Sequence, residues 1–291
     1  MKMIFRALPL LLSLLLSCNS PTTKQSQEEQ FDASESTGAE TEVQEILYAL
    51  CLPTDISQLF EKTGTNFNPE LLIPLNTLPG YVGTEQMALV IGALGVDLSY
   101  CKIYQQSAST GAYYEAVEQL SEKLNIPGSI FESSSQKLDL YFDNQDSLSI
   151  IINNIYTEVN SYFQVNGNDG LASISLFGGW IEAMYIAANI YDNENHIEMG
   201  NRILHQKFAL NNMISLLSNY QESLAVRGYV LLLNRLRTQY DKVEIKYNKE
   251  GFGIDTTNKR LQTSGAELKY DEETLDEISL LVRQIHKELL K

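Results

Sequence analysis

One apolar segment constrains the fold more than any other feature of the chain. Residues 171–191 read LASISLFGGWIEAMYIAANIY, with a single charge, that of Glu182, near the centre. A transmembrane helix needs about 20 apolar residues, so the length alone would allow a membrane span. A carboxylate at the middle of a bilayer is costly, however. We therefore expect a central helix that is buried by other helices.

Small residues form a stripe on this helix and on a second one. At 100° per residue, one arc of roughly 80° on the first helix holds small and polar side chains, namely Ser175, Gly178, Gly179, Glu182, Ile186 and Asn189. An equivalent arc on the helix predicted at 81–106 holds Ala88, Gly92, Gly95, Val96 and Ser99. Glycine costs about 1 kcal/mol relative to alanine inside a helix. We therefore predict that the two helices cross with Gly92 and Gly95 close to Gly178 and Gly179.

Helical periodicity continues through most of the remaining chain. Further helices are predicted at 43–50, 53–62, 109–125, 128–144, 146–166, 196–220 and 224–239, and a last one after Asp271. The stretch 68–80 is rich in proline and is expected to be irregular. Residues 243–247 alternate with period two, and 265–270 could pair with them across a Gly/Asn/Thr-rich loop. The predicted fold is all-α, a multi-helix bundle or array with a small β-hairpin before the C-terminal helix.

The amino end has the layout of a secretory signal. Lys2 and Arg6 precede the apolar run 7–16, which is too short to span a membrane, and the small Ser17 precedes Cys18. An ordinary signal peptide, or an uncleaved leader, that happens to end near a cysteine is the alternative interpretation. Residues 1–17 are accordingly assigned to a signal peptide.

Leu15-Leu16-Ser17-Cys18 resembles the lipobox of bacterial lipoproteins. The resemblance implies that Cys18 becomes the first residue, carries acyl chains such as palmitate, and attaches the protein to a membrane of the cell envelope. Several acyl chains would make this attachment effectively permanent. Asn19 is not the Asp of an inner-membrane retention signal, so the outer membrane is expected, with the periplasmic face and the cell surface both open.

Residues 18–42 are predicted to form a lipidated, disordered tether, and 43–291 a single helical domain. The tether has six acidic residues and one lysine, and such a segment buries too little apolar surface to fold. As a flexible coil it would span roughly 25–30 Å. From Cys18 onward the formal charge is 19 − 37, or −18. Nucleic acid is therefore excluded as a partner, because phosphate binding relies on Lys and Arg.

Two further segments resemble parts of uncharacterised helical lipoproteins of Bacteroidota. They are LGVDLSY at 94–100 and FGGWIEAMY at 177–185. The resemblance implies an all-α fold and an envelope location, and it implies no activity, catalytic residue or cofactor.

Candidate chemistry is sparse. The chain has no phosphate-binding loop, H-E-x-x-H, G-x-S-x-G or C-x-x-C motif, and we expect no catalytic residue, metal or cofactor. Asp97 and Glu182 form a speculative polar site, because a carboxylate among apolar residues can have a raised pKa. The alternative is that each binds a Tyr, Ser or backbone donor and stabilises packing. His196, His205 and His286 are expected at the surface or at helix caps.

Two function classes lead. The first is a non-enzymatic scaffold or partner-binding lipoprotein that is held at the lipid membrane and contacts an envelope protein. The second is a lipoprotein that captures a sugar or a peptide-like molecule in a groove lined by tyrosines, for which the candidates are Tyr100, Tyr104, Tyr113 and Tyr114. An enzyme has the least support.

Cys51 and Cys101 could form a disulfide or remain two buried thiols.

Overall fold

The computed structural model describes residues 64–140, 145–194, 196–247, 252–255, 260–263 and 266–290. All of them belong to one compact unit. The predicted signal peptide, the predicted tether with Cys18, the two helices predicted before residue 63, and Cys51 lie outside the described residues. Within the described residues the prediction of an all-α fold with a small hairpin before the last helix is confirmed.

Helices dominate the described part of the chain. In chain order they are the 3-10 helices η1 (Pro69–Leu71) and η2 (Leu75–Gly80), then α3 (Thr84–Ile103), α4 (Ser107–Lys123), α5 (Ser129–Leu140), α6 (Gln145–Val165), α7 (Asp169–Glu194), α8 (Ile197–His205), α9 (Lys207–Ser218), α10 (Leu224–Tyr240) and α11 (Glu272–Leu290). The proline-rich stretch expected to be irregular thus forms two short 3-10 helices.

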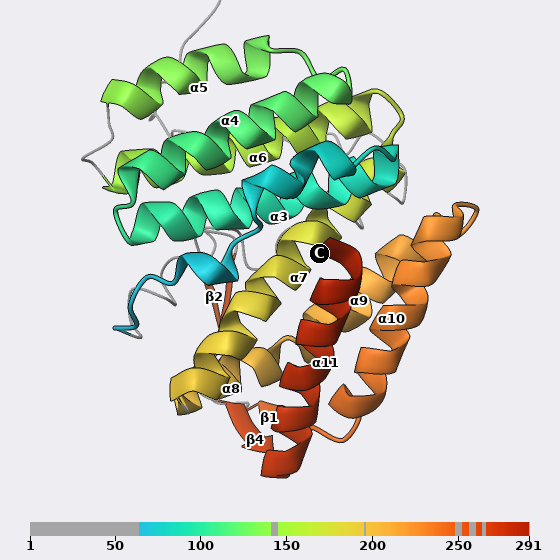
Figure 1. Ribbon diagram of the computed structural model, residues 1–291. Helices are drawn as coiled ribbons and strands as arrows, with labels where there is room; N and C mark the ends of the chain where they lie inside the picture. The colour runs from blue at the N-terminus through green and yellow to red at the C-terminus, as the bar shows by residue number, and fades with distance from the viewer. Residues whose placement is uncertain are drawn as a thin grey trace, which may run out of the picture. The chain divides into compact units, whose positions relative to one another are not determined.

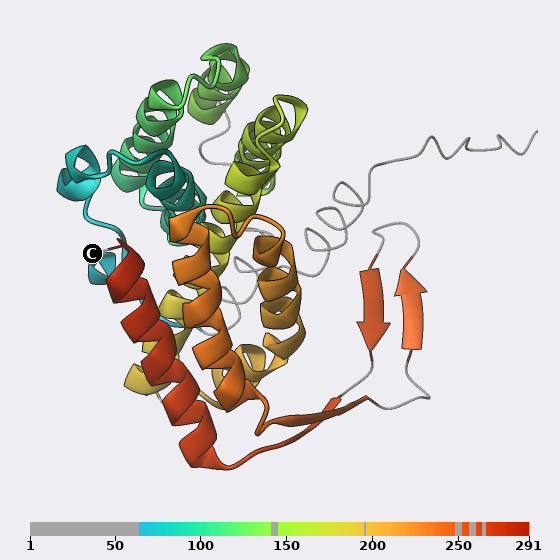
Figure 2. The ribbon, with the colours of Figure 1, turned by 90° about the vertical axis from the view of Figure 1, so that its right-hand side faces the viewer.

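Helix α7 connects two groups of helices (Figure 1). Helices α3, α4, α5 and α6 lie beside one another at one end, and α8, α9, α10 and α11 lie at the other. The most extensive helix contact is that of α3 with α7, and α7 also packs on α11 and α8. Figure 2 shows the second group from its outer side, with α10 between α9 and α11. The core of the protein therefore surrounds α7.

Helices α3 and α7 are both long and apolar enough to cross a membrane. Their most apolar windows are nevertheless 94% and 89% buried inside the protein. The structure thus uses both as core helices, as predicted for 171–191, because the other helices cover nearly all of their apolar surface.

The helix predicted at 196–220 is instead two helices, α8 and α9, which meet at Gln206. Helix α8 packs on α7 and α11, whereas α9 packs mainly on α10. The side-chain oxygen of Gln206 accepts a hydrogen bond from Trp180 Nε1 at 3.1 Å. A single straight helix could not reach both sets of partners, so tertiary packing overrides the continuous periodicity.

The chain between α10 and α11 contains two antiparallel strand pairs. Strands β1 (Glu244–Tyr247) and β4 (Ala266–Lys269) pair as the alternating pattern predicts, with Ile245 opposite Leu268. The loop between them holds a second pair, β2 (Phe252–Asp255) and β3 (Arg260–Thr263). Each pair has only two strands, so these strands add little to the core.

Candidate functional site

Three of the four predicted glycines lie at the crossing of α3 and α7. A Cβ atom added to Gly92 would overlap the carbonyl oxygen of Ser175, and one added to Gly178 would overlap that of Leu89. A Cβ on Gly179 would be 3.2 Å from the carbonyl oxygen of Gly92. The obstacles are backbone atoms, so this close approach of the two helices requires glycine at Gly92 and at Gly178.

Gly95 has a different neighbour from the one predicted. A Cβ there would be 3.3 Å from the ring of Tyr156, which belongs to α6. The hydroxyl of the same tyrosine lies 3.3 Å from the Cβ position of Gly179. Gly95 therefore makes room for an aromatic side chain of α6 and not for the backbone of α7.

The two candidate carboxylates lie together in the core, and a histidine contacts one of them, Glu182. Asp97 on α3, Glu182 on α7 and His286 on α11 are 0%, 0% and 1% exposed. Their helices are far apart in the chain, so only the folded structure assembles this group. We call Asp97, Glu182 and His286 the buried triad.

Asp97 binds the chain that precedes α3. Its Oδ2 accepts a hydrogen bond from the Ile73 backbone N–H at 2.9 Å. The hydroxyl of Tyr113 on α4 donates to the Ile73 carbonyl oxygen at 2.7 Å. Both polar groups of the Ile73 backbone are thereby paired although this residue is buried, as buried backbone groups require.

Burial raises the pKa of Asp97 well above its usual range. The negative charge of Glu182 and a hydrogen bond with that carboxyl raise the pKa further, while the Ile73 N–H acts in the opposite direction. The neutral form of the Asp97 carboxyl is therefore favoured.

Cys101, one helical turn after Asp97, is a free, buried thiol. Burial raises the pKa of this thiol, and the charge of Asp97 raises it further. The thiol form, which is less reactive than the thiolate, is therefore favoured.

His286 is the functional candidate that the sequence placed wrongly, because it is a core residue. Its Nε2 lies 2.7 Å from Oε2 of Glu182, and its ring stacks on that of Tyr185 with centroids 3.7 Å apart and planes 5° apart. The position near the end of α11 suggested a cation at the helix terminus. The sequence did contain a signal for burial. His286 lies four positions after Val282, which is buried in the same helix, and residues four apart lie on the same face of a helix.

The other two histidines are less buried. His196 caps α8, because its Nδ1 accepts a hydrogen bond from the Met199 N–H at 3.3 Å. His205 ends the same helix, and its pKa is lowered by burial and then by the charge of Arg202. The three histidines therefore lie in separate environments. Among the described residues no group of three or more His, Cys, Asp or Glu side chains is arranged to hold a metal ion.

The tyrosine cluster packs inside the protein, and Tyr100, Tyr113 and Tyr114 are buried. The hydroxyl of Tyr100 accepts from the Asn68 N–H at 3.2 Å, and that of Tyr114 donates to the Phe131 carbonyl at 2.8 Å. The Tyr104 hydroxyl is 2.5 Å from that of Thr65. These hydroxyls bind protein groups.

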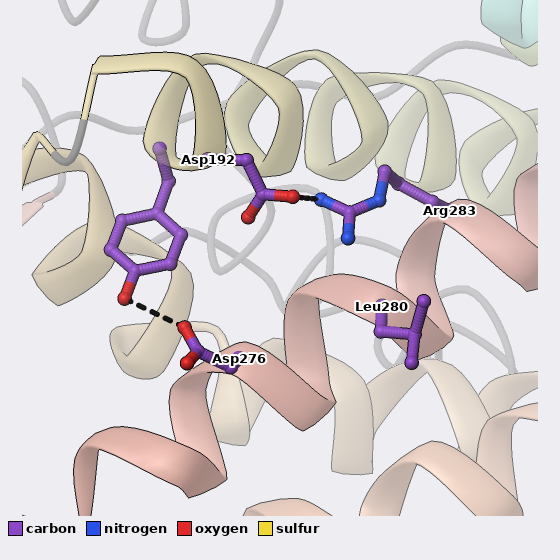
Figure 3. A pocket seen from close by; sticks show the side chains of 5 residues that line it. Asp192, Asp276, Leu280 and Arg283 are labelled. Atoms are coloured by element: carbon purple, nitrogen blue, oxygen red, sulfur yellow. Dashed lines mark hydrogen bonds and ion pairs between the residues drawn. The ribbon is translucent and has the colours of Figure 1, made fainter.

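A pocket opens at the surface between α7 and α11 (Figure 3). Its volume is about 430 Å³, and it is lined by Tyr191, Asp192, Asp276, Leu280 and Arg283. The Tyr191 hydroxyl donates to Asp276 Oδ1 at 3.0 Å, and Arg283 pairs with Asp192. The three charged side chains that line the pocket are thus each paired with another lining residue. The sequence did not single out any of these five residues.

A carboxyl, a carboxylate and an imidazole in contact have the composition of an acid–base site. Here all three side chains are enclosed by α3, α7 and α11, and the pocket is lined by other residues of α7 and α11. The arrangement that the structure shows is a buried polar link between helices α3, α7 and α11.

The raised pKa of Asp97 predicts a pH dependence of stability. The unfolded state releases this proton near pH 4, whereas the native state retains it to higher pH. Unfolding therefore releases a proton, and stability falls as the pH rises above about 4, by at most about 1.4 kcal/mol per pH unit. Asp97→Asn keeps an acceptor for Ile73 and removes the titration.

The variant and the wild type should consequently have similar unfolding free energies at acid pH, and the variant should become the more stable one as the pH rises. Urea unfolding followed by circular dichroism at a series of pH values measures both. Parallel curves for the two proteins would show that Asp97 does not titrate differently in the native and unfolded states.

Comparison with known proteins gives no match to a family model, to a curated protein or to a solved structure.

Proposed function

We propose that the protein is a lipid-anchored lipoprotein of the cell envelope whose helical domain is a non-enzymatic partner-binding module. One observation carries the proposal, the succession of a basic start, a short apolar run, Ser17 and Cys18 at the amino end. Acylation of Cys18 would attach the chain to a membrane, and the acidic segment up to residue 42 would serve as the tether.

The packing of the two most apolar helices supports this proposal. Helices α3 and α7 form the core of the described domain, so their apolar surface is already used for folding. Attachment to a membrane would then require another element, and an acylated Cys18 provides it.

The placement of the polar groups supports the choice of a binding module. Asp97, Glu182 and His286 are buried and paired, and the tyrosine hydroxyls bind other protein groups. These groups contribute to stability inside the domain. Recognition of a partner would accordingly use the outer helix faces.

Metabolic labelling tests the anchor. Cells that express the full chain are grown with an alkynyl fatty acid, and the purified protein is examined for covalent label and for membrane association. We expect label on the wild type and none on Cys18→Ala, which should also leave the membrane fraction.

The matched control is Cys51→Ala, which removes a different thiol of the exported chain and should keep the label. Label that persists on Cys18→Ala, or that is absent from the wild type, would contradict the lipoprotein assignment.

A further inference from the structure

The outward face of α10 carries a stripe of leucine and arginine. At 100° per residue, its members share an arc of about 100°, and all of them are exposed: Leu224, Arg227, Gly228, Leu231, Arg235 and Thr238. Leu224 is 77% exposed and Leu231 is 72% exposed. We call these six residues the α10 stripe. Along the helix axis it extends for about 21 Å, at 1.5 Å per residue.

The opposite side of α10 explains why the stripe faces outward. Val226, Tyr229, Val230, Leu233 and Leu236 are buried, and the ring of Tyr229 packs on Phe177 of α7 with centroids 5.5 Å apart. Figure 2 shows α10 at the outer side of its helix group. Leu224 and Leu231 are therefore apolar residues that do not contribute to the core.

The charge of α10 is opposite to that of the protein. The helix LAVRGYVLLLNRLRTQY contains three arginines and no acidic residue, in a chain with a net charge of −16. Arg227 donates to the carbonyl oxygens of Gln221 and Glu222, and Arg235 donates to Gln284 Oε1. These acceptors are neutral, so the positive charges of both arginines are available to an anionic partner.

We propose that the α10 stripe docks on an anionic lipid surface, with Arg227 and Arg235 on the headgroup phosphates and Leu224 and Leu231 in the acyl boundary. Binding of a helix at a membrane interface depends on buried apolar area and on attraction to anionic lipids, and the stripe offers both, whereas the cores of protein interfaces are depleted of charge. At physiological salt the screening length is about 8 Å, so acidic residues beyond that distance weaken the attraction of the stripe to an anionic surface only slightly.

A further exposed apolar residue lies close to the beginning of α10. The Ser223 hydroxyl donates to Glu85 Oε1 at 3.2 Å, which places the start of α3 next to the start of α10. Val82, three residues before Glu85, is 81% exposed. It therefore adds apolar surface near the Leu224 end.

The inference deepens the proposed function, because an anchored domain would be held near a membrane where a weak contact suffices. The stripe would then set which face of the domain is turned to the lipid and which faces are left for a partner. The test below uses chains without Cys18, so its result does not depend on acylation.

An environment-sensitive fluorophore reports directly on the stripe. The full chain carries Cys18→Ala and Cys51→Ala, the buried Cys101 remains, and the dye is attached at Leu231→Cys. Vesicles that contain phosphatidylglycerol should shift its emission to the blue, and vesicles of phosphatidylcholine should not. The same dye at Ile150→Cys on α6, a site that is 61% exposed, should show no shift with either vesicle.

Charge reversal tests the role of the arginines. Arg227→Glu with Arg235→Glu should weaken the vesicle titration at Leu231→Cys by at least about thirtyfold, since each arginine near an anionic surface contributes roughly fivefold. Lys123→Glu with Arg202→Glu changes the net charge equally at exposed positions of α4 and α8, and should leave the titration unchanged.

Either of two results would overturn the proposal: no blue shift at Leu231→Cys with phosphatidylglycerol vesicles, or equal losses for the two double variants. After either result, the α10 stripe would be interpreted instead as a surface that binds an acidic protein. Circular dichroism of every variant establishes that the helical fold is retained before the vesicle data are compared.

Discussion

Gly178→Ala is expected to lower the free energy of unfolding by about 3 kcal/mol, the upper part of the range for overpacked cores. The new methyl group would overlap the Leu89 carbonyl oxygen of α3. That oxygen belongs to helical backbone and cannot rotate away as a side chain could. Helices α3 and α7 would have to separate, and the core would lose contacts along the most extensive helix interface of the described domain.

Gly111→Ala on α4 is the matched control. Gly111 is an exposed helical residue, and nothing lies within 4 Å of its Cβ position. Alanine should stabilise it by about 0.5–1 kcal/mol through the lower entropy of the unfolded chain. Urea unfolding of the full chain, followed by circular dichroism, measures both variants. Similar stability changes at the two positions would show that α3 and α7 do not make backbone contact at Gly178.

His286→Phe is expected to destabilise the protein by about 3 kcal/mol, the upper part of the range for a buried polar group that loses a hydrogen bond. Phenylalanine keeps a planar ring that can stack on Tyr185, but it offers no N–H to the buried Glu182, which is 0% exposed. The substitution removes a hydrogen-bond partner of a buried carboxyl group, so the cost of burying that group is no longer offset by this bond.

A second substitution separates loss of the polar Glu182–His286 pair from loss of packing. Glu182→Met in the His286→Phe background replaces the remaining carboxylate by an apolar chain of similar length. Apolar replacement of a whole buried pair is often neutral or stabilising, so the double variant should recover most of the lost stability. A double variant that is as unstable as the sum of the two single ones would show that the two residues act independently.

Helix positions were largely predictable because they follow from local periodicity. The buried faces of α7 and α11 repeat at helical spacing, and nearly every long helix of the described chain was predicted within a few residues. The exception was the break at Gln206, where α8 and α9 turn toward different neighbours. A periodic pattern indicates that one face of a helix is buried, but it does not indicate which other helix packs on that face.

The buried triad shows the same limit for the candidate site. Asp97 and Glu182 were predicted together as a speculative polar site, because both are carboxylates on apolar helices, but the contact of Glu182 with His286 was not predicted. His286 was missed because a histidine near a helix end is equally consistent with exposure and with burial. The partner of each residue lies on another helix, 85 to 104 positions away for the pairs of Glu182.

The sequence by itself determined that the domain is helical, that α7 is a core helix, and that Gly92 and Gly178 permit close backbone contact. These properties depend on side-chain size and polarity at helical spacing, which are local. Only the tertiary structure decided that Gly95 faces Tyr156, that Asp97, Glu182 and His286 form one cluster, and that α10 exposes leucine and arginine. Those properties depend on how the helices are arranged in space, and the free energy of that arrangement comes from contacts between residues that are distant in the chain.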